Sequence, residues 1–346
     1  MRRPLTVFAA AGAVAAVLLT GCGGGSSTTS TASQDPKTAF STGVSGLTDT
    51  DVLTVTIKLD TTPENLVAFA KEGPDPSTLD PQVAQEIASA QLVLETKTED
   101  GSKLSAAKPG QSSAKTASRL VFVDGGNTLA EIRFRSDAIY AQAQVKSLLD
   151  LFQQSKAYAD LTARAAQMPA FVQAFVQGKW VSLDLNALKA LAGQFGGNAS
   201  PSSAQSQKLL TDLRALINRD VTVTRVGTDS NGDHLKLTTQ SRQLASDFVQ
   251  ALGTDIPAAG LATGSFKPSN VPDHSVVVDA WVKNGVLSKV ALDVVQFAKP
   301  GEAKPGDSLP VVVQFDRSGD DISAPTGATP VDTTQLFTLL GSLAGN

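Results

Sequence analysis

Few side chains in this sequence have the type and spacing that metal or nucleophilic chemistry needs. The chain of 346 residues has one cysteine, Cys22, and two histidines, His234 and His274. A zinc site uses three or four nitrogen or sulfur ligands, and the two histidines lie far apart, each beside an aspartate. We therefore expect no metal site and interpret both histidines as surface residues near turns.

A second pattern has the spacing with which a calcium loop begins. Asp229, Asn231 and Asp233 alternate around Gly232 as they would in an EF-hand. That loop also needs a glutamate at its twelfth position, where this sequence has Gln240. The favoured interpretation is a polar hairpin turn.

Two short segments have the spacing of a serine nucleophile. Residues 105–108 and 112–115 both fit S-x-x-K. Penicillin-binding enzymes also carry S-D-N and K-T-G boxes, and neither occurs in this sequence. The chain also contains no G-x-S-x-G, no P-loop and no G-x-G-x-x-G. We expect a non-catalytic protein with no cofactor.

Cys22 differs because of the residues before it. Arg2 and Arg3 precede an apolar run over Leu5–Leu19, a pattern typical of a secretory signal peptide. The run then continues as Leu19-Thr20-Gly21-Cys22, which resembles the bacterial lipobox. The resemblance implies a lipoprotein signal peptide over residues 1–21 and a diacylglycerol, with palmitate or similar acyl chains, on Cys22. The alternative is an ordinary secreted protein with a cysteine there by chance.

The composition after Cys22 limits the partners. Residues 22–34 are mostly Gly, Ser and Thr and predict a flexible tether. The formal net charge of −4 argues against nucleic acid as a partner and against docking on anionic lipid by charge. We expect residues 35–346 to form a single domain without an internal disulfide, a monomer held by the lipid at the extracytoplasmic face of the cell membrane.

Alternating apolar residues predict strands. Leu53, Val55, Ile57 and Leu59 would share one face of a strand. The alternation recurs at 92–94, 120–122 and 132–134, and again at 221–226, 234–239, 276–282, 290–294 and 311–315. The sequences at 124–127, 231–232 and 284–285 are hairpin turns by composition. Since hairpins join antiparallel neighbours, we expect an α+β fold: a large antiparallel sheet with helices gathered on one face.

Helical segments between the strands supply further apolar side chains. The sequence has fourteen Phe but two Trp and two Tyr, so most aromatic rings have no polar group. Such side chains fill a core, the simpler interpretation for any one of them, or line an apolar cavity between helices and a curved sheet. The candidates for such a lining are Phe171, Phe175, Trp180, Leu213, Ile217, Phe248 and Trp281.

The order of these elements is similar to that of a known lipoprotein family. The lipobox and tether, the strand over 53–59, Gly178-Lys179-Trp180-Val181 and the hairpin over 276–297 resemble the LppX/LprG-type lipoproteins of mycobacteria and their relatives, which are similar in fold to the LolA/LolB carriers. The resemblance implies a half-barrel sheet with helices on its concave face and a cavity for acyl chains. It implies no catalytic residue.

Taken together, these patterns predict a membrane-anchored lipoprotein that binds or carries a lipid or glycolipid. The alternative is a structural or interaction lipoprotein of the cell envelope with a filled core and no ligand. An enzyme acting on envelope polymers is the third hypothesis, and it has the least support in the sequence.

Overall fold

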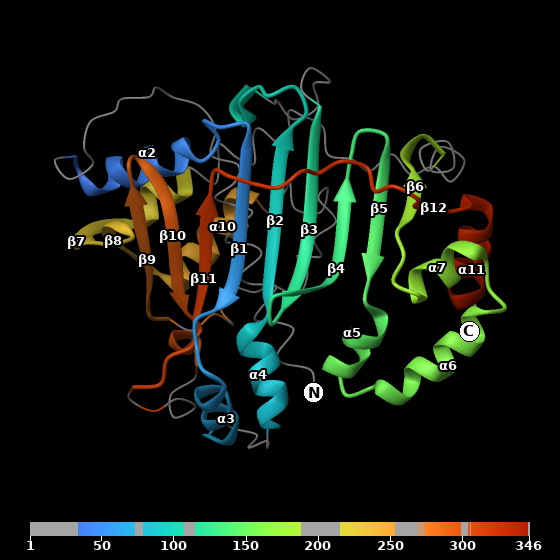
Figure 1. Ribbon diagram of the computed structural model, residues 1–346. Helices are drawn as coiled ribbons and strands as arrows, with labels where there is room; N and C mark the ends of the chain where they lie inside the picture. Colours follow the sequence, from blue (N-terminus) through green and yellow to red (C-terminus); the bar gives the residue numbers. More distant parts are fainter. Residues whose placement is uncertain are drawn as a thin grey trace.

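One sheet runs through the whole of the folded chain. The computed structural model describes residues 34–72, 79–106, 115–187, 215–252, 269, 271, 273–298, 304 and 306–344. The strands form a 12-stranded open sheet in the order β12-β6-β5-β4-β3-β2-β1-β11-β10-β9-β8-β7 (Figure 1). Cys22, the predicted signal peptide and the predicted tether up to residue 33 lie outside the described residues.

Two antiparallel meanders build the sheet. The first contains β1 (Val52–Leu59), β2 (Gln91–Thr98), β3 (Thr116–Asp124), β4 (Asn127–Phe134), β5 (Ala138–Ala143) and β6 (Val181–Asp184). The second contains β7 (Thr222–Asp229), β8 (Gly232–Gln240), β9 (Ser275–Lys283), β10 (Val286–Asp293) and β11 (Pro310–Asp316). Antiparallel pairing of β1 with β11 joins the two meanders. The predicted α+β class with a large antiparallel sheet is confirmed.

The predicted hairpins are confirmed. At 125–126 and 284–285 both turn residues lie in the left-handed region, whereas at 231–232 only Gly232 has a positive φ, and it is the first residue of β8. Asn284 and Gly285 join β9 to β10 with φ of 53° and 74°, the left-handed region that a type I′ turn needs. Residues 229–232 join β7 to β8, so this segment is a hairpin turn rather than a calcium loop. Asp229 accepts a hydrogen bond from the backbone N–H of Asn231 at 2.6 Å.

Helices precede, interrupt and follow the strands. They are α2 (Pro36–Gly46), α3 (Pro63–Glu72), α4 (Pro81–Ser89), α5 (Val145–Leu151), α6 (Ser155–Ala165), α7 (Ala170–Val176), α10 (Ser241–Leu252) and α11 (Thr333–Ala344), with 3-10 turns at Leu104–Ala106 and Val294–Phe297. Asp35 caps α2 by accepting from the backbone N–H groups of Lys37 and Thr38. No helix in the described ranges is long and apolar enough to cross a membrane.

Alternation along the strands gives the sheet an apolar face and a polar face. The apolar face carries Leu53, Val55, Ile57 and Leu59 of β1, and the polar face carries the residues between them. The main core lies on the apolar face and includes Ala39 and Phe40 of α2, Leu66 of α3 and Ala84 of α4. At Gly43, α2 lies so close to β9 that an added Cβ would come within 2.9 Å of the Val282 side chain.

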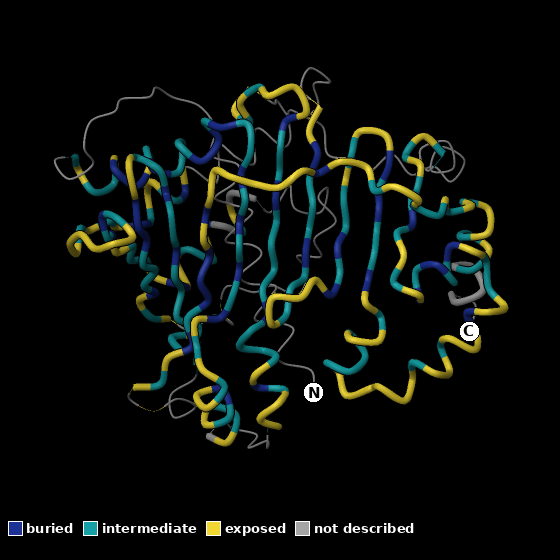
Figure 2. The backbone as a smooth tube through the Cα atoms, in the orientation of Figure 1, coloured by how far each residue is buried: buried dark blue, intermediate teal, exposed yellow. Residues whose placement is uncertain are grey.

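A smaller core lies toward the other end of the sheet. Phe171 and Ala174 of α7 pack against Val181 of β6, with Leu336 and Leu339 of α11 beside them. In Figure 2, β2 and β3 are mainly of intermediate exposure. The apolar face is therefore covered by two separate cores.

A segment with no regular structure crosses the polar face. After β11, residues 317–328, here called the strap, run across the first meander and lead to β12 (Thr329–Pro330) (Figure 1). β12 pairs in parallel with β6 at the far edge, the exception in an otherwise antiparallel sheet. This crossing has no hydrophobic periodicity, and the sequence did not predict it.

Candidate functional site: an apolar strip between two cores

A row of directly paired residues, here called the central row, crosses the apolar face from the main core to the smaller one. In register order it contains Val55, Leu94, Leu120, Ile132, Ala141 and Val181. All six side chains are apolar and point to the same face, because paired residues in a sheet share a face. The strands thus place a continuous apolar surface between α2–α4 and α7.

Burial changes along this row. Val55 is 1% exposed and Val181 is 9% exposed, so both ends are buried. Leu120 and Ile132, in the middle, are only partly buried. In the described part of the chain, neither of these two residues belongs to either core. The cores therefore leave the middle of the apolar face incompletely covered.

Neighbouring rows extend this surface along the strands. We define the apolar strip as Leu92, Leu94, Leu120, Phe122, Ile132, Phe134 and Ile139. Leu92 and Leu94 form its border with the main core, against which they pack. Phe134 is 43% exposed, unusually high for a side chain on the apolar side of a sheet. Thr96 and Ser118 bring hydroxyl groups to the same face, with their oxygens 3.0 Å apart. A surface of this composition suits a hydrocarbon chain rather than a charged ligand.

The structure brings two of the predicted lining residues to one end of the strip. Phe171 and Phe175 lie in the smaller core with Val181 and Ala141, where the central row ends. Ile217 is partly buried and belongs to neither core among the described residues. Leu213 and the side chain of Phe248 lie outside the described residues.

The two tryptophans lie away from the strip. Trp180 packs under Arg133, whose guanidinium carbon is 4.9 Å from the ring centroid. Trp281 alternates with Ala280 and Val282 of the main core, so it projects to the polar face. The alternation of Val276, Val278, Ala280 and Val282 in the sequence already indicates this orientation of Trp281.

Polar groups surround Trp281. The His234 ring stacks on it with centroids 4.5 Å apart, and the His234 Nε2 atom lies 2.7 Å from Asp279 Oδ1. The Trp281 N–H donates to Asp229 at 2.8 Å, and the Lys289 ammonium lies 4.7 Å from the ring centroid. Each group has a partner, which is typical of a structural cluster.

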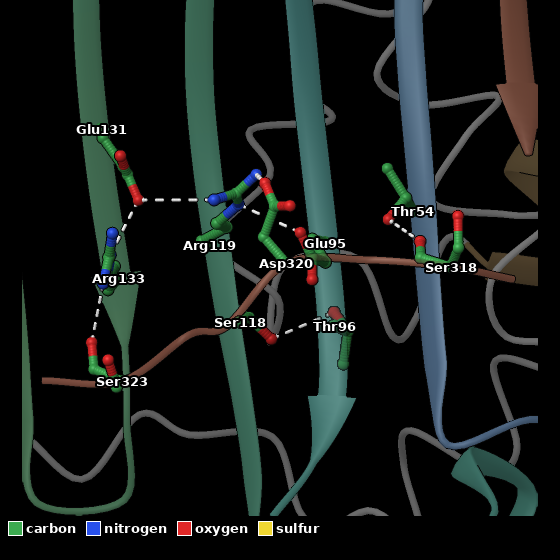
Figure 3. A network of polar contacts seen from close by, with 10 residues as sticks. All are labelled: Thr54, Glu95, Thr96, Ser118, Arg119, Glu131, Arg133, Ser318, Asp320 and Ser323. Atoms are coloured by element: carbon green, nitrogen blue, oxygen red, sulfur yellow. Dashed lines mark hydrogen bonds and ion pairs between the residues drawn. The ribbon is translucent and has the colours of Figure 1, made fainter. Parts of the chain in front are cut away.

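A network of charges lies on the polar face, directly behind the strip. Arg119 contacts Glu95 at 3.0 Å and Asp320 of the strap at 2.5 Å (Figure 3). Glu131 lies 4.0 Å from Arg119 and 2.7 Å from Arg133. Burial raises the pKa of the Glu95 carboxyl above its ordinary value of 4.5, against the opposing effect of Arg119.

A polar depression of about 560 Å³ lies between α4 and the α5–α6 turn. Its lining includes Asp80, Glu86, Lys146 and Asp150, and Lys146 is paired with Asp150 at 2.6 Å. The described residues contain no group of three or more His, Cys, Asp or Glu side chains arranged to hold a metal ion. The charged lining does not suit an acyl chain.

Comparisons with known proteins do not assign this chain to a family. No family model matches the sequence, and no curated protein matches it significantly.

Proposed function

We propose that this protein is a non-catalytic lipoprotein that binds the acyl chains of a lipid on the apolar strip. The observation that carries the proposal is the central row, whose apolar side chains are buried at both ends and partly exposed at Leu120 and Ile132. An apolar surface left between two cores loses the free energy of burial unless a ligand covers it.

The energetics favour a long hydrocarbon chain. Each methylene group that leaves water contributes about 0.8 kcal/mol, so a single acyl chain supplies several kcal/mol without a polar contact. The open antiparallel sheet with α2, α4 and α7 on its apolar face is compatible with a LolA-like arrangement. Lipid attachment at Cys22 would keep the strip close to the bilayer that supplies its ligand.

The direct test is a lipid analysis of the full-length protein. Organic extracts of the purified protein are examined by mass spectrometry, and the delipidated protein is titrated with the fluorescent fatty acid cis-parinaric acid. We expect a co-purifying lipid and saturable binding of the probe. If extracts contain no lipid and the probe does not bind, the alternative of an envelope interaction protein without a ligand replaces this proposal.

Two matched variants locate the binding surface. Phe134→Ser removes an exposed ring from the strip, and we expect probe affinity to fall by about tenfold, the effect of losing roughly 1.4 kcal/mol of apolar contact. Phe152→Ser removes a ring that is 65% exposed beyond the C-terminus of α5 and should leave affinity unchanged. Equal effects of the two variants would argue against the strip as the site.

A further inference from the structure

The strap is attached to the sheet differently from any strand. In the described part of the chain, no backbone–backbone hydrogen bond joins residues 318–328 to the sheet. Side chains of the sheet make the attachments instead. The hydroxyl of Thr54 donates to the Ser318 carbonyl at 2.7 Å, and the Arg133 guanidinium donates to the Ser323 carbonyl at 2.8 Å.

The attachments follow one register row of the polar face, apart from Arg135, whose guanidinium donates to the Ile322 carbonyl at 2.9 Å. Thr54, Glu95, Arg119 and Arg133 are directly paired across β1 to β4, and the strap meets them in sequence order (Figure 3). Beyond β4, the backbone N–H groups of Thr329 and Val331 donate to the carbonyls of Trp180 and Ser182. The strap therefore spans the first meander at right angles to its strands.

One residue of the strap has no space for a side chain. A Cβ added at Gly319 would overlap the Glu95 carboxylate, whose side chain is 1% exposed. Next to it, Asp320 pairs with Arg119, and two residues further on Ile322 is buried at 2% exposure. The strap is thus seated closely on the network, although most of its own residues are exposed.

The same strands carry the network on one face and the apolar strip on the other. Glu95 follows Leu94, Arg119 precedes Leu120, and Arg133 lies between Ile132 and Phe134. The strap also connects the second meander directly to β12 and α11, which pack with the smaller core. A change in strap seating would therefore alter the position of the smaller core relative to the main core.

We propose that residues 317–328 act as a clasp that holds the smaller core against the rest of the sheet and sets the width of the apolar strip on the opposite face. The first part concerns the fold alone. The second part, on the strip, rests on the proposed function. When the clasp opens, side-chain contacts, the seat of Ile322 and the short β12–β6 pairing are lost, while the antiparallel pairings among β1 to β6 are kept.

The test uses the full-length protein and three variants. Gly319→Ala pushes the strap away from Glu95 without changing any charge, and Asp320→Asn removes the carboxylate with which the strap pairs with Arg119. Asp321→Asn is the control, since it makes the same charge change at the adjacent, exposed residue. If Gly319→Ala does not fold, Asp320→Asn provides the same test.

Hydrogen–deuterium exchange measures the clasp directly. In Gly319→Ala and Asp320→Asn we expect the amides of Thr329, Val331 and α11 to exchange about tenfold faster, while those of β9 and β10 are unchanged. The control should match the wild type. Unchanged exchange at Thr329 and Val331, or equal acceleration in β9 and β10, would contradict the proposed clasp.

Titration with cis-parinaric acid measures the coupling to the strip. We expect the affinity of both clasp variants for the probe to be at least about threefold lower than that of the control, because a wider strip makes fewer contacts with one acyl chain. Faster exchange with unchanged affinity would refute the coupling. If the wild type does not bind the probe, the proposed function fails. The exchange data alone then test whether residues 317–328 hold the smaller core against the rest of the sheet.

Discussion

Glu95 and Arg119 occupy opposed positions on β2 and β3, with 3.0 Å between the carboxylate and the guanidinium. The side chain of Glu95 is 1% exposed and that of Arg119 is 16% exposed. An ion pair this deep depends on both partners, because either charge left alone in a buried site is strongly destabilising. The pair also forms the seat of the strap through Asp320 and Gly319.

Arg119→Met should lower the free energy of unfolding by about 3 kcal/mol, because it leaves the Glu95 carboxylate buried without its counter-charge. Urea denaturation measures the change. Arg242→Met is the matched control, since Arg242 pairs with Asp273 at an exposed site and should cost less than about 1 kcal/mol. The double variant with Glu95→Gln should regain part of the loss, and a double variant no more stable than Arg119→Met would contradict this explanation.

The pH dependence of the free energy of unfolding should contain a distinct contribution from Glu95. Its raised pKa means that the folded chain binds this proton more tightly than the unfolded chain does. Stability contributed by this group is therefore present below pH 4.5 and falls as the pH rises through the raised pKa. Denaturation experiments give the free energy of unfolding of the wild type and of Glu95→Gln at each pH in this range. We expect the wild type to lose stability relative to Glu95→Gln as the pH rises. A difference that does not change with pH would contradict the raised pKa of Glu95.

Gly232→Ala should destabilise the β7–β8 hairpin by about 2 kcal/mol. Gly232 has a φ of 125°, and a Cβ there would overlap the Val282 carbonyl. Gly227 in β7 is the control, because a Cβ there would meet nothing within 4 Å, and its change to Ala should stay within about 0.5 kcal/mol. Thermal denaturation of the two variants distinguishes them, and equal midpoints would refute the steric argument.

Cys22→Ser should abolish acylation and release the protein from the membrane, because serine has no thiol to receive the lipid. Metabolic labelling with a fatty acid and detergent phase separation measure both effects. Ser26→Ala, in the predicted tether, should keep the label and the membrane association. A Cys22→Ser variant that still incorporates the fatty acid would rule out this cysteine as the lipidated residue.

Much of the sheet could be predicted because its signals are local. The alternation over β1 and the Asn-Gly turns at 231–232 and 284–285 depend on neighbouring residues alone. The chemistry of the turn residues fixes which strands are adjacent, and the adjacent strands fix most of the sheet.

The strap and the strip depend on contacts between distant segments. Arg119 and Asp320 are separated by most of the chain, and the sequence around each is compatible with an ordinary exposed charge. Leu120 and Ile132 have the pattern of any buried strand, and only the positions of the two cores show that they are less covered than Val55.

The pairing of β1 with β11 has a consequence for synthesis. Val55 pairs with Phe315, so the first strand made acquires one of its two neighbours only when nearly the whole chain is available. Until then the first meander exposes the unpaired backbone edge of β1, and the second exposes that of β10. A chain that stops before Pro310 would keep both edges open and would associate through them, so completion of β11 is the step that protects the newly made protein from aggregation.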